Sequence, residues 1–374
     1  MMNESLAGFV SAFPARDKVY GVIGGPAGLA AGRFQDLTER QQVEEWSVLP
    51  GAALGAGRSA PDRAMLGASV EHLHRLGISG IAIIGGNGSM SLAKALGDVA
   101  NTAGTGLAVV GVPKTVDNDL DGTDHSPGFL SAATCLLALV ADLDLDHAAM
   151  TSIEAVRIIE TLGRGVGWLA ASAWMDGRAA PVGPHIILLP EHRFDDSQLL
   201  ALIEDSLIRN GRALVVVAEG AAESVSGGVF SQAVFDRPLQ SRVGESIGDL
   251  VRQGLGVTCR VEVPGLLQRC CSWAVSSLDR EEARALGKFS AELLLEGASE
   301  VMTALGPIDG RPLTRRLATV ELERVANRTR PLPPEWIPPL DMPSPGFLQW
   351  VEPMLRTPAS PVPLMQRPFP GIVR

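Results

Sequence analysis

Short apolar runs alternate with longer segments of helical periodicity through most of the chain. The runs that predict strands are residues 81–84, 107–112, 156–160, 185–189, 214–218 and 257–263. The segments that predict helices are residues 62–76, 89–99, 129–143, 166–175, 196–209, 239–252 and 280–294. Continuous apolar strands followed by helices predict an α/β fold whose sheets are mostly parallel and covered on both faces. In such sheets ligands bind at the carboxyl ends of the strands.

The last part of the chain has a different pattern. Residues 331–374 contain 13 of the 26 prolines, with Trp336, Phe347, Trp350 and Phe369 between them. So many prolines argue against a sheet in this segment. Two interpretations are open: a strap that packs over the body or another subunit, or a flexible tail.

Composition narrows the class of protein. The 374 residues are 46% hydrophobic and 20% charged, which fits a soluble globular chain of two domains and excludes a disordered one. The net charge of −10 predicts neither a nucleic-acid nor a membrane partner. No apolar run reaches the length of a bilayer span, and residues 1–4 lack the basic start of a secretory signal, so we expect a cytoplasmic protein. The four cysteines fit neither a zinc site nor a disulfide framework.

A glycine-rich segment lies between the first predicted strand and the helix that follows it. It comprises Gly85, Gly86, Asn87, Gly88 and Ser89. Glycines allow close approach of a ligand to the backbone, and a helix N-terminus favours an anion. A plain tight turn explains the same residues equally well.

A polar segment, residues 113–124, follows the second predicted strand. It contains Lys114, one of only four lysines in the chain, together with several carboxylates. Lys114 could hold a phosphate, Asp117 could accept a proton and Asp119 could hold Mg²⁺. A solvated polar loop would explain the composition, but not a scarce lysine beside paired carboxylates at the end of a strand.

Two later segments add cations at strand ends. Arg164 follows a strand among glycines, and Arg260 and Arg269 flank another strand end. Together with Glu219, at the end of the run 214–218, they are typical of groups that converge on a phosphorylated polyol.

The ordered series of these motifs resembles the phosphofructokinase family, from residue 3 to about residue 355. The resemblance implies two Rossmann-like parallel-sheet domains and transfer of a phosphoryl group to the 1-hydroxyl of fructose 6-phosphate, with Asp117 as base and with Lys114 and Arg164 in catalytic roles. It implies that Mg²⁺ is held by Asn87 and Asp119. The substrate-binding set would be Thr115, Val116, Asp117, Leu162, Gly163, Arg164, Glu219, Arg260, Leu266, Gln268 and Arg269, and the donor-binding set Arg58, Gly85, Gly86, Gly88, Ser89 and Lys114.

Within the family the motifs are more similar to the pyrophosphate-dependent branch. Pro113-Lys114-Thr115 stands where ATP users carry Gly-Thr, and a lysine stem would fill space that a nucleotide needs. Gly88, in contrast, goes with ATP use. The alternatives are therefore an ATP-dependent phosphofructokinase or a kinase of another sugar phosphate. The resemblance also implies a glycolytic role and a homodimer or homotetramer, in which a neighbouring subunit typically supplies an arginine.

The match begins late. Residues 3–8 resemble the end of the family's first phosphate loop, so the strand and glycine loop before them are expected to be missing. We expect a donor domain at 1–150, a sugar-phosphate domain at 151–300, and a C-terminal helix and strap at 301–374. The missing loop, Asn87 and Leu266 favour one more alternative, a catalytically impaired regulatory or binding subunit.

Overall fold

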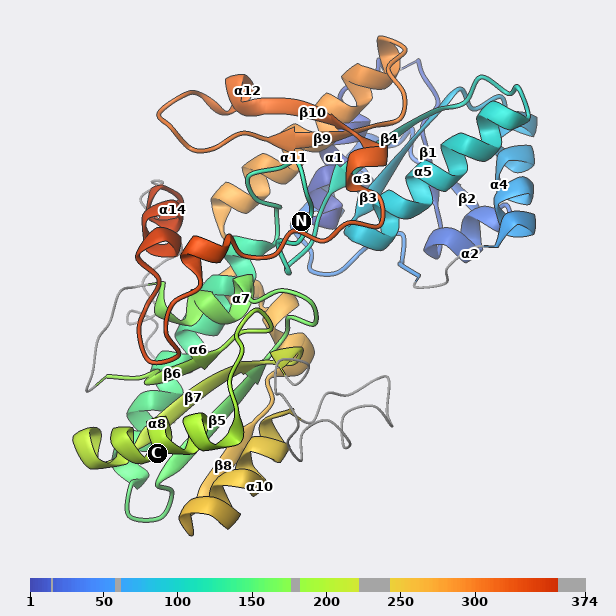
Figure 1. Ribbon diagram of the computed structural model, residues 1–374. Coiled ribbons are helices and arrows are strands. Elements are labelled where there is room, and N and C mark those ends of the chain that lie inside the picture. Colours follow the sequence, from blue (N-terminus) through green and yellow to red (C-terminus); the bar gives the residue numbers. More distant parts are fainter. Residues whose placement is uncertain (15, 58–61, 176–181, 222–242, 356–374) are drawn as a thin grey trace, which may run out of the picture. The chain divides into compact units, whose positions relative to one another are not determined.

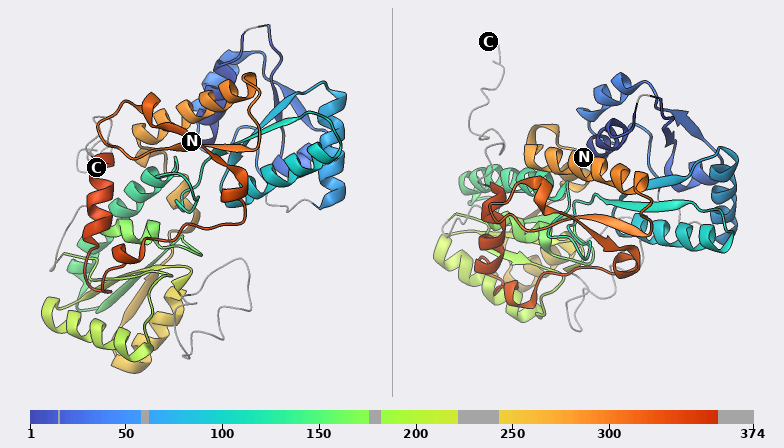
Figure 2. Two further views of the ribbon diagram at one scale, coloured as in Figure 1. Left: turned by 45° about the horizontal axis from the view of Figure 1, so that its top comes forward. Right: turned by 90° about the horizontal axis from the view of Figure 1, so that it is seen from above.

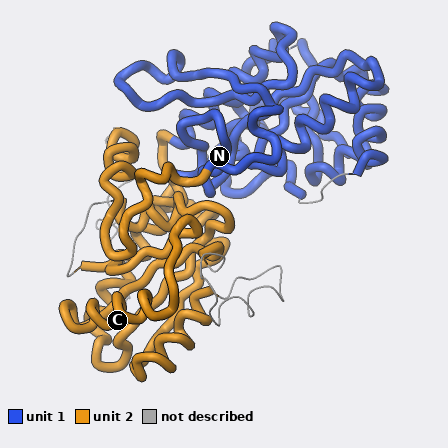
Figure 3. Tube along the Cα trace, viewed as in Figure 1, with its two compact units in different colours: residues 1–129, 279–330 blue, residues 130–278, 331–374 orange. Residues whose placement is uncertain are grey.

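The structure is a computed structural model that describes residues 1–374 except 15, 58–61, 176–181, 222–242 and 356–374. The chain forms two compact units, each made of two separate stretches (Figure 3). Unit 1 is Met1–Phe129 with Asp279–Arg330, and unit 2 is Leu130–Leu278 with Pro331–Arg374. This division differs from the expected boundaries at 150 and 300, because the strand Val301–Leu305 pairs with a strand of unit 1.

Unit 1 is built on a four-stranded sheet of order β10-β9-β4-β3 (Figure 1). Strands β3, β4 and β9 are parallel, and β10 is antiparallel to β9. Their bounds are Gly80–Gly85 (β3), Ala108–Pro113 (β4), Val301–Leu305 (β9) and Leu317–Glu321 (β10). A separate antiparallel pair joins β1, Tyr20–Val22, to β2, Phe34–Asp36.

Helices surround the unit 1 sheet. Helix α5 packs on β3 and β4, and α4 lies against α5 (Figures 1 and 2). Their apolar faces form one core with the sheet, centred on Leu96, Val109 and Met302. The helices are α1 Met2–Ser11, α2 Gly25–Ala30, α3 Arg40–Ser47, α4 Arg63–Arg75, α5 Asn87–Thr102, α11 Ser277–Leu295, α12 Leu313–Arg316 and α13 Leu322–Val325.

Unit 2 holds a parallel sheet of order β6-β7-β5-β8. Strands β5 and β7 are buried along their whole length; β7 is apolar throughout, as a buried parallel strand should be, whereas β5 also buries Arg157 and Glu160. The strands are β5 Val156–Thr161, β6 Ile186–Leu188, β7 Ala213–Ala218 and β8 Cys259–Glu262. The helices are α6 Phe129–Met150, α7 Trp168–Ala171, α8 Asp196–Asn210, α10 Val243–Leu255 and α14 Pro345–Leu355, with short 3-10 turns η1 Ser172–Trp174, η3 Gly265–Arg269, η4 Ser272–Ala274 and η5 Pro334–Trp336.

The proline-rich segment packs on unit 2 as far as Leu355, the last residue described there. The ring centroids of Trp336 and Trp350 lie 6.0 and 4.9 Å from that of Trp168. Phe347, on α14, is buried in the same cluster and is only 1% exposed. Of the two interpretations of this segment, the structure therefore supports the strap over residues 331–355, and no strand occurs in that range.

The expected strands and helices are present, with bounds shifted by a few residues, and the α/β class is confirmed. The expected helix 166–175 is instead α7 followed by η1, and the first residues of the expected helix 239–252 lie outside the described residues. Periodicity did not predict β1, β2, β9 or β10. None of the described helices is both long and apolar enough to cross a bilayer.

Candidate active site

The carboxyl ends of β3 and β4 bring two predicted segments together in unit 1. Gly85 pairs in register with Pro113, and the main-chain N–H of Lys114 donates to the carbonyl of Gly85 at 3.0 Å. A Cβ built on Gly86 would lie 3.3 Å from Cβ of Thr115, so the two loops are in close contact. Both loops line a cavity of about 1240 Å³.

The glycine segment presents a helix N-terminus to this cavity. Helix α5 begins at Asn87, and a Cβ on Gly85 would lie only 2.1 Å from Oγ of Ser89, which explains the glycine there. No heavy atom lies within 4 Å of a Cβ on Gly88, so this side of the loop is open. Backbone N–H groups at the start of a 16-residue helix could hold a phosphate.

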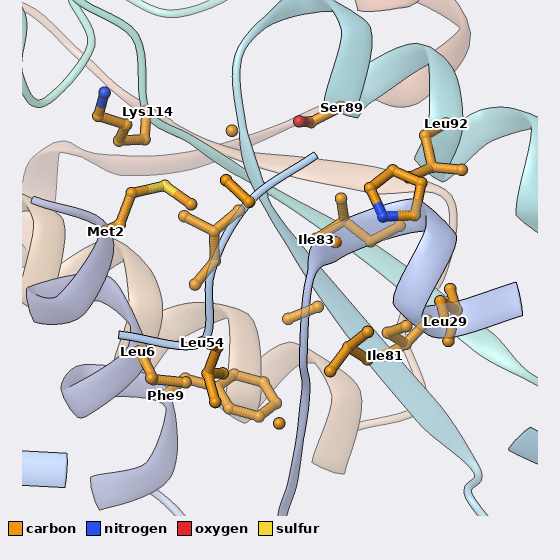
Figure 4. Close-up of a pocket in the computed structure, with 18 of the residues that line it drawn as sticks. Met2, Leu6, Phe9, Leu29, Leu54, Ile81, Ile83, Ser89, Leu92 and Lys114 are labelled. Carbon is orange, nitrogen blue, oxygen red and sulfur yellow. The ribbon is translucent and has the colours of Figure 1, made fainter. Parts of the chain in front are cut away.

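Figure 4 shows Lys114 and Ser89 at one end of the cavity and apolar side chains at the other. The aliphatic stem of Lys114 lies against Gly128, because a Cβ there would be 3.5 Å from Cε. The apolar lining includes Leu6, Phe9 and Ile83. Ile83 belongs to β3, and in the described part of the chain no strand pairs with the edge of β3 that faces away from β4.

Asp117 and Asp119 lie on either side of Asn118 and line the same cavity. Asn118 is fully buried with φ of +55°, a left-handed conformation that Asn tolerates better than most residues. Its side-chain oxygen accepts a hydrogen bond from the main-chain N–H of Ser126 at 2.9 Å. The hydroxyl of Thr115 accepts from the N–H of Asp117 at 3.1 Å.

Asn87 and Asp119 fit a Mg²⁺ site. Nδ2 of Asn87 donates to Oδ2 of Asp119 at 2.6 Å, and the remaining Oδ1 atom of each side chain is buried without a hydrogen-bond partner. Burial raises the pKa of Asp119, an effect that the hydrogen bond from Asn87 opposes. The described residues contain no cluster of three His, Cys, Asp or Glu side chains that could hold a metal. A site of two protein oxygens, completed by phosphate oxygens and water, is the arrangement typical of Mg²⁺.

A buried ionic cluster supports the loop behind these carboxylates. His125 is 1% exposed, and its two ring nitrogens lie 2.8 Å from Oδ2 of Asp124 and 2.7 Å from Oε2 of Glu282. Burial lowers the pKa of His125, but Glu282 and Asp124 outweigh it and raise the pKa to about 10. Arg316 donates to the second oxygen of Glu282 at 3.2 Å.

Arg330 contacts the same loop through main-chain carbonyls. Its guanidinium donates to the carbonyls of Asn118, Thr123 and Asp124 at 3.0, 2.6 and 2.7 Å. Burial lowers its pKa to about 10, so it stays charged at neutral pH. Sequence reasoning missed both His125 and Arg330, and no local motif marks either of them.

In unit 2 the ends of β5 and β7 bring Arg164 and Glu219 together. Nε of Arg164 lies 3.4 Å from Oε1 of Glu219, and Arg164 is 67% exposed. Gly163 has φ of +131°, which favours glycine, and a Cβ on Gly220 would lie 1.7 Å from the carbonyl oxygen of Arg164. The backbone path that places Arg164 at the strand ends therefore requires glycine at both positions.

Residues of η3 follow β8 at the same edge of this sheet. Gln268 is buried and hydrogen-bonds to the hydroxyl of Thr161, at the end of β5, so it anchors η3. Leu266 and Arg269 are exposed on either side of it. Arg260 lies at the start of β8, in register with Arg157, and its Nε pairs with Glu154 at 2.6 Å. Within this chain, Arg260 therefore does not join Gln268 and Arg269, because the strand places it at the opposite end.

Three other predicted residues have simple placements. Val116 is buried in the apolar interior, and Leu162 is half-buried beside Gly163. Arg58 lies outside the described residues.

Comparisons with known proteins identify the family of this chain. The chain is 36% identical to a sulfofructose kinase from Alkalicoccus urumqiensis, over 90% of this chain and 88% of that protein. It is 31% identical to a pyrophosphate–fructose 6-phosphate 1-phosphotransferase from Xanthomonas campestris, over 90% of this chain and 84% of that protein. An ATP-dependent 6-phosphofructokinase from Corynebacterium efficiens is 33% identical over 77% of this chain and 80% of that protein.

The fold is also similar to that of a solved structure, a pyrophosphate-dependent phosphofructokinase from Marinobacter aquaeolei. The TM-score is 0.81 at 26% identity, and the match covers 97% of this chain and 90% of that one. The family model described as "Phosphofructokinase" matches residues 1–294. The chain therefore belongs to the phosphofructokinase family, as its motifs and their positions at the strand ends predicted.

Proposed function

We propose that this chain transfers a phosphoryl group from pyrophosphate to the 1-hydroxyl of fructose 6-phosphate, giving fructose 1,6-bisphosphate. The observation that carries the choice of donor is the position of Lys114, at the end of the cavity that the glycine segment and Asp117 also line. The relatives of this chain include enzymes that are named for pyrophosphate and for ATP, so membership of the family does not identify the phosphoryl donor.

In the proposed reaction the residues divide into groups with different roles. The N-terminus of α5 and Lys114 bind the donor phosphates, and Asp117 accepts the proton of the sugar hydroxyl. Asn87 and Asp119 would hold Mg²⁺, which neutralises charge on the donor phosphates when bound. In unit 2, Arg164 offsets charge on the transferring group, Glu219 binds sugar hydroxyls and Arg269 binds the anionic end of the sugar.

Two features of the donor site act in opposite directions. The stem and charge of Lys114 occupy space that the inner phosphate of a nucleotide would need, whereas Gly88 leaves its side of the loop open. The Lys114 side chain alone is enough to keep a nucleotide out, whereas the open space beside Gly88 does not by itself make room for one. Lys114 should therefore decide the donor, and the reaction should be reversible because pyrophosphate and the sugar phosphoester are close in energy.

Initial rates with pyrophosphate and with ATP, at saturating sugar phosphate and Mg²⁺, test the donor. We expect turnover with pyrophosphate and little with ATP, and Lys114→Gly should weaken pyrophosphate use and admit ATP. Lys18→Gly is the matched control, because Lys18 is an exposed lysine that lines the same cavity but belongs to neither of the loops that follow β3 and β4. Wild-type turnover with ATP but not pyrophosphate would refute the donor assignment.

Replacement of the base tests the transfer reaction itself. Asp117→Asn should lower turnover by roughly two to four orders of magnitude, with little change in sugar-phosphate affinity. Asp121→Asn, in the same loop but outside the cavity lining, should keep parental turnover. Near-parental turnover of Asp117→Asn would show that Asp117 is not the base. Wild-type protein that binds the sugar phosphate but transfers nothing from either donor would support a regulatory or binding subunit.

A second acceptor, sulfofructose, is favoured by the loop that follows β8. In this chain Arg260 pairs with Glu154 at the other end of β8, which leaves Arg269 as the cation on η3. Its exposed neighbours on η3, Leu266 and Leu267, are apolar. A phosphate monoester carries about −1.5 to −2 charges at pH 7, whereas a sulfo group carries a single one. One cation beside leucines suits the smaller charge, and the relative with 36% identity is named a sulfofructose kinase.

Calorimetric titration of fructose 6-phosphate and of sulfofructose separates the two acceptors. Arg269→Ala should weaken binding of the true acceptor by about 2–5 kcal/mol, because a charge-assisted contact is lost. If sulfofructose binds more tightly and is turned over faster than fructose 6-phosphate, then sulfofructose is the acceptor. The proposed roles of the unit 1 residues would be unchanged.

A further inference from the structure

The loop that carries Asp117 and Asp119 is a tight, acidic turn of the main chain. Asn118 stands between the two carboxylates with its backbone in the left-handed region, at φ of +55°. Asp121 and Asp124 follow within the same loop, which therefore concentrates negative charge. Such a conformation persists only where surrounding contacts hold it.

Arg330 supplies contacts to both arms of this loop. Its guanidinium donates to the carbonyl of Asn118 on the first arm, and to those of Thr123 and Asp124 on the second. Its main-chain N–H donates to the carbonyl of Asp119 at 2.9 Å. The planar fork of several N–H donors lets one side chain reach three carbonyls, and its charge also offsets the acidic side chains of the loop.

The far end of the loop is anchored independently. The N–H of Asp124 donates to the carbonyl of Leu305, at the end of β9, at 2.8 Å. The N–H of Leu305 donates to the hydroxyl of Thr123 at 3.0 Å. Arg330 thus connects the arm that holds Asp117 and Asp119 to an arm that is already fixed to the sheet.

We propose that Arg330 is a positioning residue, which fixes the separation and direction of Asp117 and Asp119 by clamping the main chain between them. The expected effect of Arg330 on turnover rests on the proposed function. Its effect on the order of the loop does not depend on that function. A displacement of about 1 Å at a catalytic group can cost about 10²-fold in rate. Loss of the clamp should therefore lower turnover more than it lowers affinity.

The kinetic test compares Arg330→Ala and Arg330→Lys with Arg328→Ala, a nearby exposed arginine. Arg330→Ala should lower kcat by about 10²-fold, leave the KM for sugar phosphate within about threefold and raise the Mg²⁺ concentration needed for half-maximal rate. Added guanidinium at millimolar concentration should restore part of the rate of Arg330→Ala, whereas Arg328→Ala should keep parental values. Parental kcat in Arg330→Ala, or a loss that guanidinium does not restore at all, would overturn the proposal.

Hydrogen exchange separates a failure of the clamp from a failure of the proposed function. In Arg330→Ala the amides of Ser126 and Asp117, which donate to side chains of the loop, should exchange faster than in the wild type. Amides of the β3–β4 pairing and all amides of Arg328→Ala should be unchanged. Unchanged exchange of the loop amides in Arg330→Ala would overturn the proposal, whatever the wild type transfers.

Discussion

At the scale of single residues, the loop that carries Asp117 and Asp119 depends on charges that are far away in the sequence. His125 lies between Asp124 and Glu282, and Glu282 in turn accepts from Arg316. A buried ionic cluster of this kind is stable only while every charge has its partner. The loop of the candidate base is thus supported by a residue of α11 and a residue of α12, both distant in sequence.

His125 predicts a pH dependence of stability. Because its pKa is about 10 in the folded protein and near 6.5 when unfolded, its contribution is complete below about pH 6.5 and is lost as the pH rises toward 10. The stability gap between the wild type and His125→Gln should be largest at pH 6 and shrink by pH 10. Urea denaturation at several pH values measures it, with the exposed His74→Gln as a control. A gap that stays constant or grows with pH would contradict the charged state of His125.

Sequence reasoning found residues whose chemistry and strand position coincide. Lys114 and Asp117 were predicted because a scarce cation and carboxylates follow a buried strand. His125 and Arg330 were not, because their partners, Glu282 and a set of main-chain carbonyls, are defined only by the folded chain. Arg260 shows the reverse case: it is close to Gln268 in sequence, but β8 carries it to the other end of the sheet.

At the scale of elements, a strand was predictable where its sequence is a run of apolar residues, and burial alone does not mark one, since β9 is buried at four of its five positions and was not predicted. Strand β7 is a continuous apolar run, whereas β10 has three exposed residues among its five and gives no such run. The strap was predicted only as one of two alternatives, since prolines exclude a sheet but do not reveal what covers the aromatic residues. Its contacts with Trp168 decide between them.

The strap should contribute strongly to the stability of unit 2. Phe347→Ala removes a fully buried ring from the cluster with Trp168 and Trp350, so the free energy of unfolding should fall by about 3–5 kcal/mol. Met342→Ala, in the same segment but 55% exposed, should change it by less than about 0.5 kcal/mol. Denaturation followed by circular dichroism measures both. Equal stability of the two variants would show that the strap is not part of the core.

At the scale of the whole molecule, the chain passes between its units at residues 129/130, 278/279 and 330/331. Periodicity could not predict this, because β4 and β9 pair across about 190 residues of sequence. The candidate groups divide accordingly: Lys114, Asp117 and Asp119 belong to unit 1, and Arg164, Glu219 and Arg269 to unit 2. Each unit therefore carries part of the proposed chemistry.

Among the described residues no strand pairs with the outer edge of β3, so we expect that unit 1 would accept another strand there. This edge lines the apolar cavity, and Met2 lies at the cavity end where β3 finishes (Figure 4). An apolar segment of about six residues ending in glycine, fused before Met1, could run parallel to β3 and bury Ile81 and Ile83. We expect the unfolding midpoint to rise by about 4 °C or more.

A fusion of equal length with aspartates at alternate positions is the control, since charged side chains cannot fill an apolar cavity. Calorimetry of both fusions and the parent measures the effect. Equal midpoints for the two fusions would show that the cavity does not bind a strand.

The distribution of tryptophan gives the molecule a natural optical label. Of the six tryptophans, only Trp46 belongs to unit 1, and the other five, including the strap pair Trp336 and Trp350, belong to unit 2. Intrinsic emission excited at the indole band therefore reports almost entirely on unit 2, while Trp46→Phe would silence unit 1. Stopped-flow fluorescence of that variant would follow the refolding of unit 2, the strap included, with no dye attached to the protein.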